Sequence, residues 1–383
     1  MEWLADVMRS IMIVAGEASG DLHGATLATA LRTLTPQCRL VGMGGPKMRA
    51  AGVEVREDVT AAAAVGWTEA VSRVPRLYGA YRRLTAMVAR ERPAALVVID
   101  FPEFNLRLAA AARARGVPVV YFIAPQIWAW RGGRIRAMRR RVSLVLAIFP
   151  FEVPLYRAAG VPVEFVGHPV LDALTTAPSR VEARRQLGIV DDALVIGLLP
   201  GSRREEIDRV LPIMREATAR IGADPPPRFL VALAPTVTRE TAACHLDHDG
   251  RLELVEAATY SVIRAADVLL VASGTASLEA AVLGTPMAVS YRVSRLTEIM
   301  SRSLVRVPWI SVVNLALGRQ VVPELYQANA TGASLAAEAS RLIRDAGARR
   351  AQSDAFAELR TELGDPGVGA RAARCVLAAA GAS

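Results

Sequence analysis

Short apolar runs rich in β-branched residues alternate with amphipathic stretches over almost the whole chain. Such runs predict strands buried on both faces, and their alternation with helical stretches predicts parallel sheets covered by helices. In the first half we expect strands at Ile11–Ala15, Arg39–Val41, Ala95–Ile99, Val117–Ile123, Leu144–Ile148 and Glu164–Val166. In the second half we expect them at Leu194–Leu199, Arg228–Ala234, Leu252–Val255, Val268–Val271 and Pro286–Val289.

The chain is too long for one hydrophobic core. With 383 residues, and roughly 100–200 residues per domain, two domains of similar size are expected. Each half opens with a strand that runs into a small-residue turn and then a helix, which predicts an α/β fold with two Rossmann-like parallel-sheet domains facing a central cleft. We place the first domain at 1–175, a linker at Thr175–Ile189, the second domain at 190–350, and a C-terminal helical segment at 351–383 that packs back on the first domain.

The composition permits an anionic partner without identifying one. The net charge is +9, but Lys47 is the only lysine among 46 basic residues, a skew that fits a GC-rich genome. Exposed aromatic residues at base-stacking spacing are missing, which disfavours nucleic acid. The three cysteines lie far apart and form neither a disulfide framework nor a zinc pattern. No run of 18 uncharged apolar residues occurs, so we expect a cytoplasmic protein with only peripheral membrane contact.

The first strand runs into "GEASGD" at residues 16–21. This turn lacks the G-x-G-x-x-G of dinucleotide binders. Its two acids, Glu17 and Asp21, would repel a pyrophosphate. An NAD-dependent oxidoreductase is therefore disfavoured.

The segment "ASGTASLEA" has the composition of a phosphate site. Backbone amides at a helix start carry partial positive charge, so Ser273, Gly274 and Thr275 can seat a diphosphate. Glu279 lies about one helical turn later and can accept hydrogen bonds from a ribose. The alternative is an ordinary Ser/Thr N-cap.

The segment "LLPGSR" adds a second turn of this kind. Its Ser202 and Arg203 precede a helix, and a guanidinium can form a two-pronged bond to phosphate oxygens and neutralise a departing diphosphate. The alternative is a surface arginine beside the acids that follow.

The segment "VVIDFPEFN" ends a strand with Asp100, Glu103 and Asn105, at the edge where ligands bind in open α/β sheets. An aspartate there can take a proton from a sugar hydroxyl. The alternative is an Asp that caps the following turn.

Two further segments bear on surfaces and metals. "HLDHDG" at residues 245–250 has the residues of a metal cluster, but it lies between a helix and a strand among polar neighbours, so we expect no metal there. Apolar residues flanked by arginines recur at helical spacing before and after Pro75, which we expect to limit the start of that helix. This stripe suits either the headgroup boundary of a bilayer or a core helix, and it comprises Trp67, Val71, Val74, Leu77 or Tyr78, Tyr81 and Leu84.

Taken together, the motifs of the chain resemble one family, lipid-A-disaccharide synthase. In order, they are "VAGEASGDLHGA", "VGMGGPKM", "VVIDFPEFN", "PQIWAWR", "FPFE", "VGHPVLD", "LLPGSR", "ASGTASLEA" and "VNLALGR", and the similarity runs from about Ile11 to Leu363. Two departures are mild: Glu103 stands where the family commonly has Asp, and Val313 where Pro is usual.

The resemblance implies an inverting glycosyltransferase of GT-B-like architecture that needs no metal or other cofactor. The donor would be UDP-2,3-diacylglucosamine and the acceptor 2,3-diacylglucosamine 1-phosphate, giving UDP and a β(1→6)-linked disaccharide phosphate, the lipid A precursor. Such an enzyme would work at the inner membrane surface. The oligomeric state is left open, a homo-oligomer included.

The resemblance also assigns roles to residues. Asp100 would be the base, and Arg203 with the amides of residues 273–275 would stabilise the leaving UDP. Glu279 would hold the ribose, and the first turn would shape the acceptor side, its carboxylates bonding hydroxyls. The remaining residues expected to contact substrate or nucleotide are Ser19, Gly20, Asp21, His23, Glu103, Asn105, Gln126, Ser202, Asn314 and Arg319, and the arginines between Arg131 and Arg141 would meet anionic headgroups.

Two other functions remain open on the sequence. One is another sugar-nucleotide enzyme of the same architecture, such as a UDP-GlcNAc epimerase or a transferase with a soluble acceptor. The other is a non-catalytic protein that uses the positive charge to bind nucleic acid.

Overall fold

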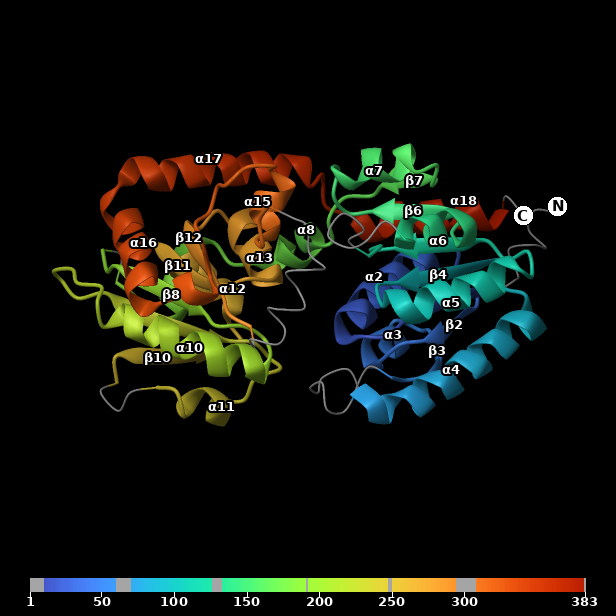
Figure 1. Cartoon of the computed structure of the whole chain (residues 1–383), viewed down its shortest axis with the longest axis horizontal. Coiled ribbons are helices and arrows are strands. Elements are labelled where there is room, and N and C mark those ends of the chain that lie inside the picture. Colours follow the sequence, from blue (N-terminus) through green and yellow to red (C-terminus); the bar gives the residue numbers. More distant parts are fainter. Residues whose placement is uncertain are drawn as a thin grey trace. The chain divides into compact units, whose positions relative to one another are not determined.

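The computed structural model describes residues 10–59, 70–125, 133–190, 192–246, 250–293 and 308–381. The chain divides into two compact units (Figure 1). The first comprises Met1–Asp172 together with Leu363–Ser383, and the second comprises Ala173–Glu362.

Within the described residues, the first unit is built on a seven-stranded sheet with strand order β3-β2-β1-β4-β5-β6-β7. All of its strand pairs are parallel. The strands are β1 (Ile11–Ala15), β2 (Leu40–Met43), β3 (Glu54–Glu57), β4 (Ala95–Ile99), β5 (Val119–Phe122), β6 (Leu144–Ala147) and β7 (Val163–Phe165). Apart from β3, each lies within one or two residues of an expected strand.

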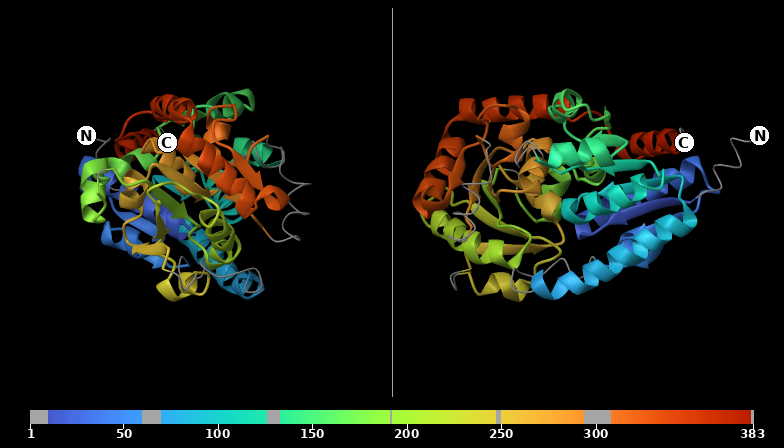
Figure 2. Two further views of the ribbon diagram at one scale, coloured as in Figure 1. Left: turned by 90° about the vertical axis from the view of Figure 1, so that its left-hand side faces the viewer. Right: turned by 45° about the vertical axis from the view of Figure 1, so that its right-hand side comes forward.

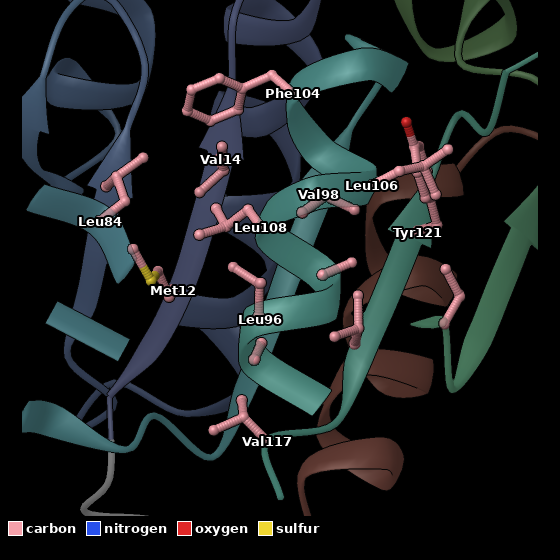
Figure 3. Packing of buried hydrophobic residues seen from close by; sticks show 14 of the residues in the cluster. Met12, Val14, Leu84, Leu96, Val98, Phe104, Leu106, Leu108, Val117 and Tyr121 are labelled. Carbon is pink, nitrogen blue, oxygen red and sulfur yellow. The ribbon is translucent and has the colours of Figure 1, made fainter. Parts of the chain in front are cut away.

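Helices cover both faces of this sheet because successive side chains of each strand point to opposite faces. Met12 and Val14 of β1 face a core formed with α4, α5 and α6 (Figure 3), whereas Ile11 and Ile13 face a core formed with α2 and α18. Helix α18 packs against α2, although it lies at the other end of the sequence (Figure 2). The helices are α2 (Ala18–Leu34), α3 (Pro46–Ala50), α4 (Ala70–Glu91), α5 (Pro102–Arg113), α6 (Gly133–Arg141), α7 (Glu152–Ala158), α8 (Val170–Ala173) and α18 (Val368–Gly381).

The second unit has a six-stranded parallel sheet in the order β10-β9-β8-β11-β12-β13. Its strands are β8 (Val195–Leu199), β9 (Arg228–Leu233), β10 (Leu252–Glu256), β11 (Val268–Ala272), β12 (Met287–Tyr291) and β13 (Glu324–Tyr326). Helices α10 and α16 supply one core, while α12 meets the other face at Gly197 of β8. The helices are η3 (Leu174–Thr176), α9 (Arg180–Gln186), α10 (Arg204–Thr218), α11 (Arg239–Ala243), α12 (Thr259–Ala265), α13 (Thr275–Val282), α15 (Val312–Ala316), η4 (Gln327–Asn329), α16 (Gly332–Arg344) and α17 (Ala346–Glu362).

The two parallel-sheet α/β units confirm the expected fold class, but two expected boundaries are wrong. The stretch expected to be a linker forms α9, which starts with a Ser179 capping box and packs on α12. Arg184 of α9 is buried and donates to Asp267, so this stretch belongs to the second unit. At the other end, residues 351–362 lie in α17, which packs on α13 and α16 of the second unit, and the return to the first unit begins at Leu363.

Helix α4 differs from the expectation in its start and in its apolar stripe. Pro75 lies inside the helix, not at its beginning. Leu84 is completely buried in the core, and Leu77 and Tyr81 pack against that core, so the prediction that Leu84 contacts a membrane is wrong. Trp67 and the side chains of Val71 and Val74 lie outside the described residues. None of the helices described is long and apolar enough to cross a membrane.

Candidate active site

Four of the motifs singled out in the sequence lie at the points where each sheet reverses its strand order. In the first unit β1 and β4 are neighbours, and their carboxyl ends lead into Gly16 and Asp100. In the second unit β8 and β11 are neighbours, and they lead into Pro200 and Ser273. In open α/β sheets, ligands bind outside the carboxyl ends of the strands at such switch points.

The turn after β4 has a strained backbone. Asp100 has a φ of 47° and Phe101 a φ of 49°, so two consecutive residues other than glycine adopt left-handed conformations. Each such residue costs about 1–3 kcal/mol and persists only where the surrounding structure enforces it, most often at functional sites. A third left-handed residue, Ile123 with φ 55°, follows the neighbouring strand β5.

The side chain of Asp100 is a good candidate for a base. Burial raises the pKa of its carboxyl group, the Phe101 amide hydrogen bond opposes that rise, and the charge of Glu103 adds to it. No described side chain donates a hydrogen bond to this carboxylate. A carboxylate whose pKa is raised by burial accepts a proton more readily than a solvated one.

The turns after β1 and β4 are packed together. A Cβ atom on Gly16 would lie 2.4 Å from the ring of Phe101, so only glycine fits there. The Phe101 ring in turn stacks on Phe104, with ring centroids 5.5 Å apart. The Phe101 ring therefore links the backbone before α2 to the strained turn.

Two predicted binding residues of this unit have internal roles instead. Asp21 is buried, and its carboxylate accepts hydrogen bonds from the amides of Gly45, Lys47 and Met48, where α3 begins. Asn105 is completely buried, and its amide nitrogen donates to the carbonyls of Ile99 and Asp100. The described hydrogen bonds of both side chains therefore hold the chain itself, and contact of Asp21 or Asn105 with substrate stays a prediction.

The other predicted residues of this unit remain available or lie elsewhere. Ser19 is exposed in the first turn of α2, while Gly20 packs its backbone against Ala15. Glu103 is exposed and pairs with Arg134 of α6. Gln126 lies outside the described residues, as do Asp247, His248 and Asp249 of the segment "HLDHDG". His245 of that segment makes a 2.8 Å contact with Asp208.

A second histidine, His168, lies near His23 and was missed by the sequence reasoning. Burial, with a smaller effect of Lys47, lowers the pKa of His23 to about 4. Burial, with a smaller effect of His23, lowers the pKa of His168 to about 3. The Val170 amide donates to His168 Nδ1 at 3.1 Å, which places the ring proton on Nε2. The only signal in the sequence was its place in the motif "VGHPVLD".

In the second unit, the start of α13 follows the expectation in part. The helix begins at Thr275, and Gly274 precedes it with a φ of 156°. The Ser273 amide donates to the Ser290 carbonyl, so this amide is not free for a diphosphate. The Gly274 and Thr275 amides have no described hydrogen-bond acceptor, and both residues are exposed.

Glu279 lies half-buried one turn into α13, as the spacing predicted. Burial raises the pKa of its carboxyl group, against the lowering effect of a hydrogen bond from the Tyr260 hydroxyl. That hydroxyl donates to Glu279 Oε1 at 3.1 Å. The carboxylate keeps a second oxygen as an acceptor, and Tyr260 is a partner that the sequence did not indicate.

The turn after β8 is closed by an acid of its own helix. Glu206 accepts hydrogen bonds from the amides of Ser202 (2.8 Å) and Arg203 (3.2 Å), the positions expected for phosphate oxygens. These two amides therefore already have an acceptor in this arrangement, and contact of Ser202 with substrate stays a prediction. The Arg203 guanidinium also contacts Glu206, but its side chain is 76% exposed and extends into solvent.

The two predicted residues of "VNLALGR" are engaged within the unit. Asn314 is completely buried; its amide nitrogen donates to Val322 and Glu324, and its oxygen accepts from the Val321 and Val322 amides. All of its hydrogen-bonding capacity is used, so the prediction of direct nucleotide contact is wrong for Asn314. Arg319 forms an ion pair with Glu358 on the exposed surface.

A cavity in the second unit lies away from these residues. It has a volume of about 340 Å³ and is lined at the opposite, amino-terminal edge of the sheet by groups such as Arg180, Asp267 and Arg350. None of the predicted site residues lines it.

Comparisons with known proteins show the family. The profile of the family described as Lipid-A-disaccharide synthetase matches residues 11–377. The chain belongs to the lipid-A-disaccharide synthase family. It is 42% identical to the lipid-A-disaccharide synthase of Myxococcus xanthus over 369 residues, covering 96% of each chain. It is also 42% identical to that of Geobacter metallireducens, covering 96% of this chain and 97% of the relative. Members of this family are glycosyltransferases of lipid A biosynthesis.

Solved structures with the same fold are more distant in sequence. An S. aureus MnaA–UDP complex superposes with a TM-score of 0.65 at 15% identity and covers 94% of both chains. MurG of Acinetobacter baumannii gives a TM-score of 0.59 at 15% identity, covering 96% of this chain and 99% of that one. A UDP-GlcNAc 2-epimerase of Neisseria meningitidis gives 0.58 at 13% identity, covering 96% and 98%. At these identities the likeness establishes the fold alone, that of GT-B-type glycosyltransferases and epimerases.

Proposed function

We propose that the protein condenses UDP-2,3-diacylglucosamine with 2,3-diacylglucosamine 1-phosphate, with inversion at the donor C1. The products are UDP and the β(1→6)-linked disaccharide 1-phosphate. Family membership over nearly the whole chain supports the reaction class. The observation that carries the mechanism is the half-buried Asp100 carboxylate at the switch point of the first sheet.

In this mechanism the first unit activates the acceptor. The Asp100 carboxylate takes the proton of the acceptor 6-hydroxyl as its oxygen bonds to C1 of the donor. The C1–phosphate oxygen bond breaks on the opposite face, and UDP departs with that electron pair. Inversion follows from a single displacement, and the raised pKa of Asp100 favours the proton transfer.

The second unit holds the leaving group. The exposed guanidinium of Arg203 and the amides of Gly274 and Thr275 meet the diphosphate, where positive charge and N–H dipoles stabilise the charge that develops. Glu279 accepts hydrogen bonds from the ribose with the oxygen that Tyr260 leaves free.

Both substrates carry acyl chains, so the protein works at the inner membrane surface on its cytoplasmic side. Helix α4 is the proposed contact: Tyr78 is 62% exposed, with Arg82 exposed nearby on the same helix. An apolar ring beside cationic side chains suits the headgroup region of an anionic bilayer. Co-sedimentation with phosphatidylglycerol vesicles should weaken in Tyr78→Ser, and unchanged binding would remove α4 from the proposal.

The reaction is tested by incubating detergent-dispersed donor and acceptor with the enzyme and measuring UDP and disaccharide. Asp100→Asn should lose most turnover, whereas Asp354→Asn, an exposed carboxylate on α17, should keep it. Normal turnover in folded Asp100→Asn would exclude the base but not the reaction. Epimerisation of UDP-GlcNAc without disaccharide formation would exclude the reaction itself.

A further inference from the structure

The strained turn at Asp100 and Phe101 does not persist by local preference. Aspartate tolerates a left-handed conformation, but phenylalanine at φ 49° is an outlier. The conformation determines where the Asp100 carboxylate lies, because the side chain leaves the backbone at the first of the two left-handed residues. The contacts that hold this peptide therefore determine the geometry of the proposed base.

Tyr121 supplies one of these contacts from the neighbouring strand. It lies on β5, paired with Val98 of β4, and its ring is completely buried in the core (Figure 3). Its hydroxyl donates to the Asp100 carbonyl oxygen at 2.7 Å. Burial raises the pKa of Tyr121 well above its usual value, with further increases from the charge of Asp100 and the proximity of Tyr156. The hydroxyl therefore remains a neutral donor over the whole working range of pH.

Asn105 supplies the second contact from the first turn of α5. Its amide nitrogen donates to the same Asp100 carbonyl at 2.7 Å and to the Ile99 carbonyl at 3.1 Å. Its Oδ1 is buried and has no hydrogen-bond partner among the described residues. A buried unpaired oxygen is destabilising. The two hydrogen bonds that the Asn105 amide nitrogen donates therefore account for an asparagine at this buried position.

We propose that Tyr121 and Asn105 are positioning residues that hold the left-handed Asp100–Phe101 turn and thereby aim the Asp100 carboxylate at the acceptor hydroxyl. Neither side chain touches the substrate; both act through one carbonyl oxygen. The inference rests on the proposed function in that Asp100 is taken as the base.

The test uses two tyrosines that differ in what their hydroxyls hold. Tyr156 is also completely buried in the same core, and its hydroxyl donates to the Pro125 carbonyl at 3.3 Å. Tyr121→Phe and Tyr156→Phe therefore remove the same group from similar surroundings, but only the first releases the Asp100 turn. The comparison uses kcat, KM, the pH profile of kcat and thermal unfolding of the full-length enzyme.

Tyr121→Phe should lower kcat roughly 10- to 100-fold with KM little changed, because a misplaced base affects the transition state more than binding. The acidic limb of its pH profile of kcat should move to lower pH. The reason is that an Asp100 carboxylate released towards water loses the burial that raises its pKa. Tyr156→Phe should share the stability loss without either kinetic change. Equal kinetics in both variants would overturn the proposal.

Asn105→Ser provides a second test that does not depend on Tyr121→Phe folding. The same kcat and pH effects are expected, and the double variant should fall short of the product of the single effects, because both donors hold one carbonyl. Independent effects, or a crystal structure of Tyr121→Phe with φ of Asp100 unchanged, would overturn the proposal. Failure of the proposed function looks different: the wild-type enzyme would release no UDP from the two lipid substrates.

Discussion

Glu206 and Arg203 are joined by two hydrogen bonds: the Glu206 carboxylate accepts from the Arg203 amide at 3.2 Å and from its guanidinium at 3.1 Å. A Cβ atom on Gly201 would lie 2.5 Å from the same carboxylate, so the backbone of the turn packs closely against Glu206. Glu206 thus caps the amino terminus of α10 in place of the expected phosphate.

Removing this cap should destabilise the second unit. Glu206→Ala leaves the Ser202 and Arg203 amides without their acceptor, and loss of a helix cap costs about 1 kcal/mol. Glu205→Ala is the matched control, because Glu205 lies in the same turn but, within the described part of the chain, pairs with Arg209 alone on the surface. Urea unfolding should separate the two variants; equal midpoints would show that the cap contributes nothing.

Arg203 should matter for turnover far more than for folding. Its side chain is largely exposed, and its one ion pair among the described residues is with Glu206, so Arg203→Ala should unfold at nearly the wild-type temperature. If the guanidinium meets the departing diphosphate, kcat should fall roughly 100-fold or more. Arg204→Ala, whose side chain is 82% exposed, should retain wild-type kcat. A similar small effect in both variants would argue against contact between Arg203 and UDP.

The sequence predicted the strands well where both faces of the strand are buried. The runs of β1, β4, β8 and β11 are apolar throughout, because helices cover each sheet on both sides. Edge strands β3 and β13 were missed because they are short and partly exposed, and β3 reads Glu-Val-Arg-Glu. The turns that follow the central strands were thus located correctly from the ends of apolar runs.

The roles of polar residues in those turns were harder to predict. Asp21, Asn105, Asn314 and Glu206 have the composition of a binding site, yet each of them bonds backbone groups of its own unit. The amides that Asp21 accepts from lie 24–27 residues away in the sequence. A motif shows which groups can bind a ligand, whereas only the fold shows which of them are already used.

Asp100 should destabilise the folded protein at neutral pH. Burial raises the pKa of its carboxyl group above the ordinary 3.8, so the folded state binds the proton more tightly than the unfolded state. The free energy of unfolding should then fall as the pH rises from below 3.8 through the raised folded-state pKa. Asp100→Asn removes this charge and should unfold at a higher temperature than wild type at pH 7. The difference in unfolding temperature should disappear below pH 3.8, where Asp100 is protonated in both states. A variant less stable than wild type at pH 7 would contradict this prediction.

The two half-buried histidines, His23 and His168, should make the first unit sensitive to mild acid. Burial lowers the pKa of His23 to about 4 and of His168 to about 3, both from 6.5. Between pH 6.5 and these values the unfolded chain binds protons that the folded chain does not, so stability falls as the pH falls. His23→Gln should flatten the dependence of unfolding free energy on pH between 6.5 and 4, where His23 alone accounts for on the order of 3 kcal/mol. An unchanged slope in both His23→Gln and His168→Gln would show that neither histidine is the cause.

The contact between Gly16 and Phe101 should couple the first turn to the proposed base. In Gly16→Ala the new methyl group would lie 2.4 Å from the Phe101 ring, so the ring and the turn that carries Asp100 must move. Overpacking of this kind costs about 1–3 kcal/mol, and displacement of the base should lower kcat roughly 10- to 100-fold. Gly222→Ala is the control, since nothing lies within 4 Å of a Cβ atom there. Replacing Phe101 with the smaller leucine in the Gly16→Ala background removes the clash and should recover part of the lost stability and part of the lost kcat. A double variant no better than Gly16→Ala would show that the Phe101 ring does not transmit the change.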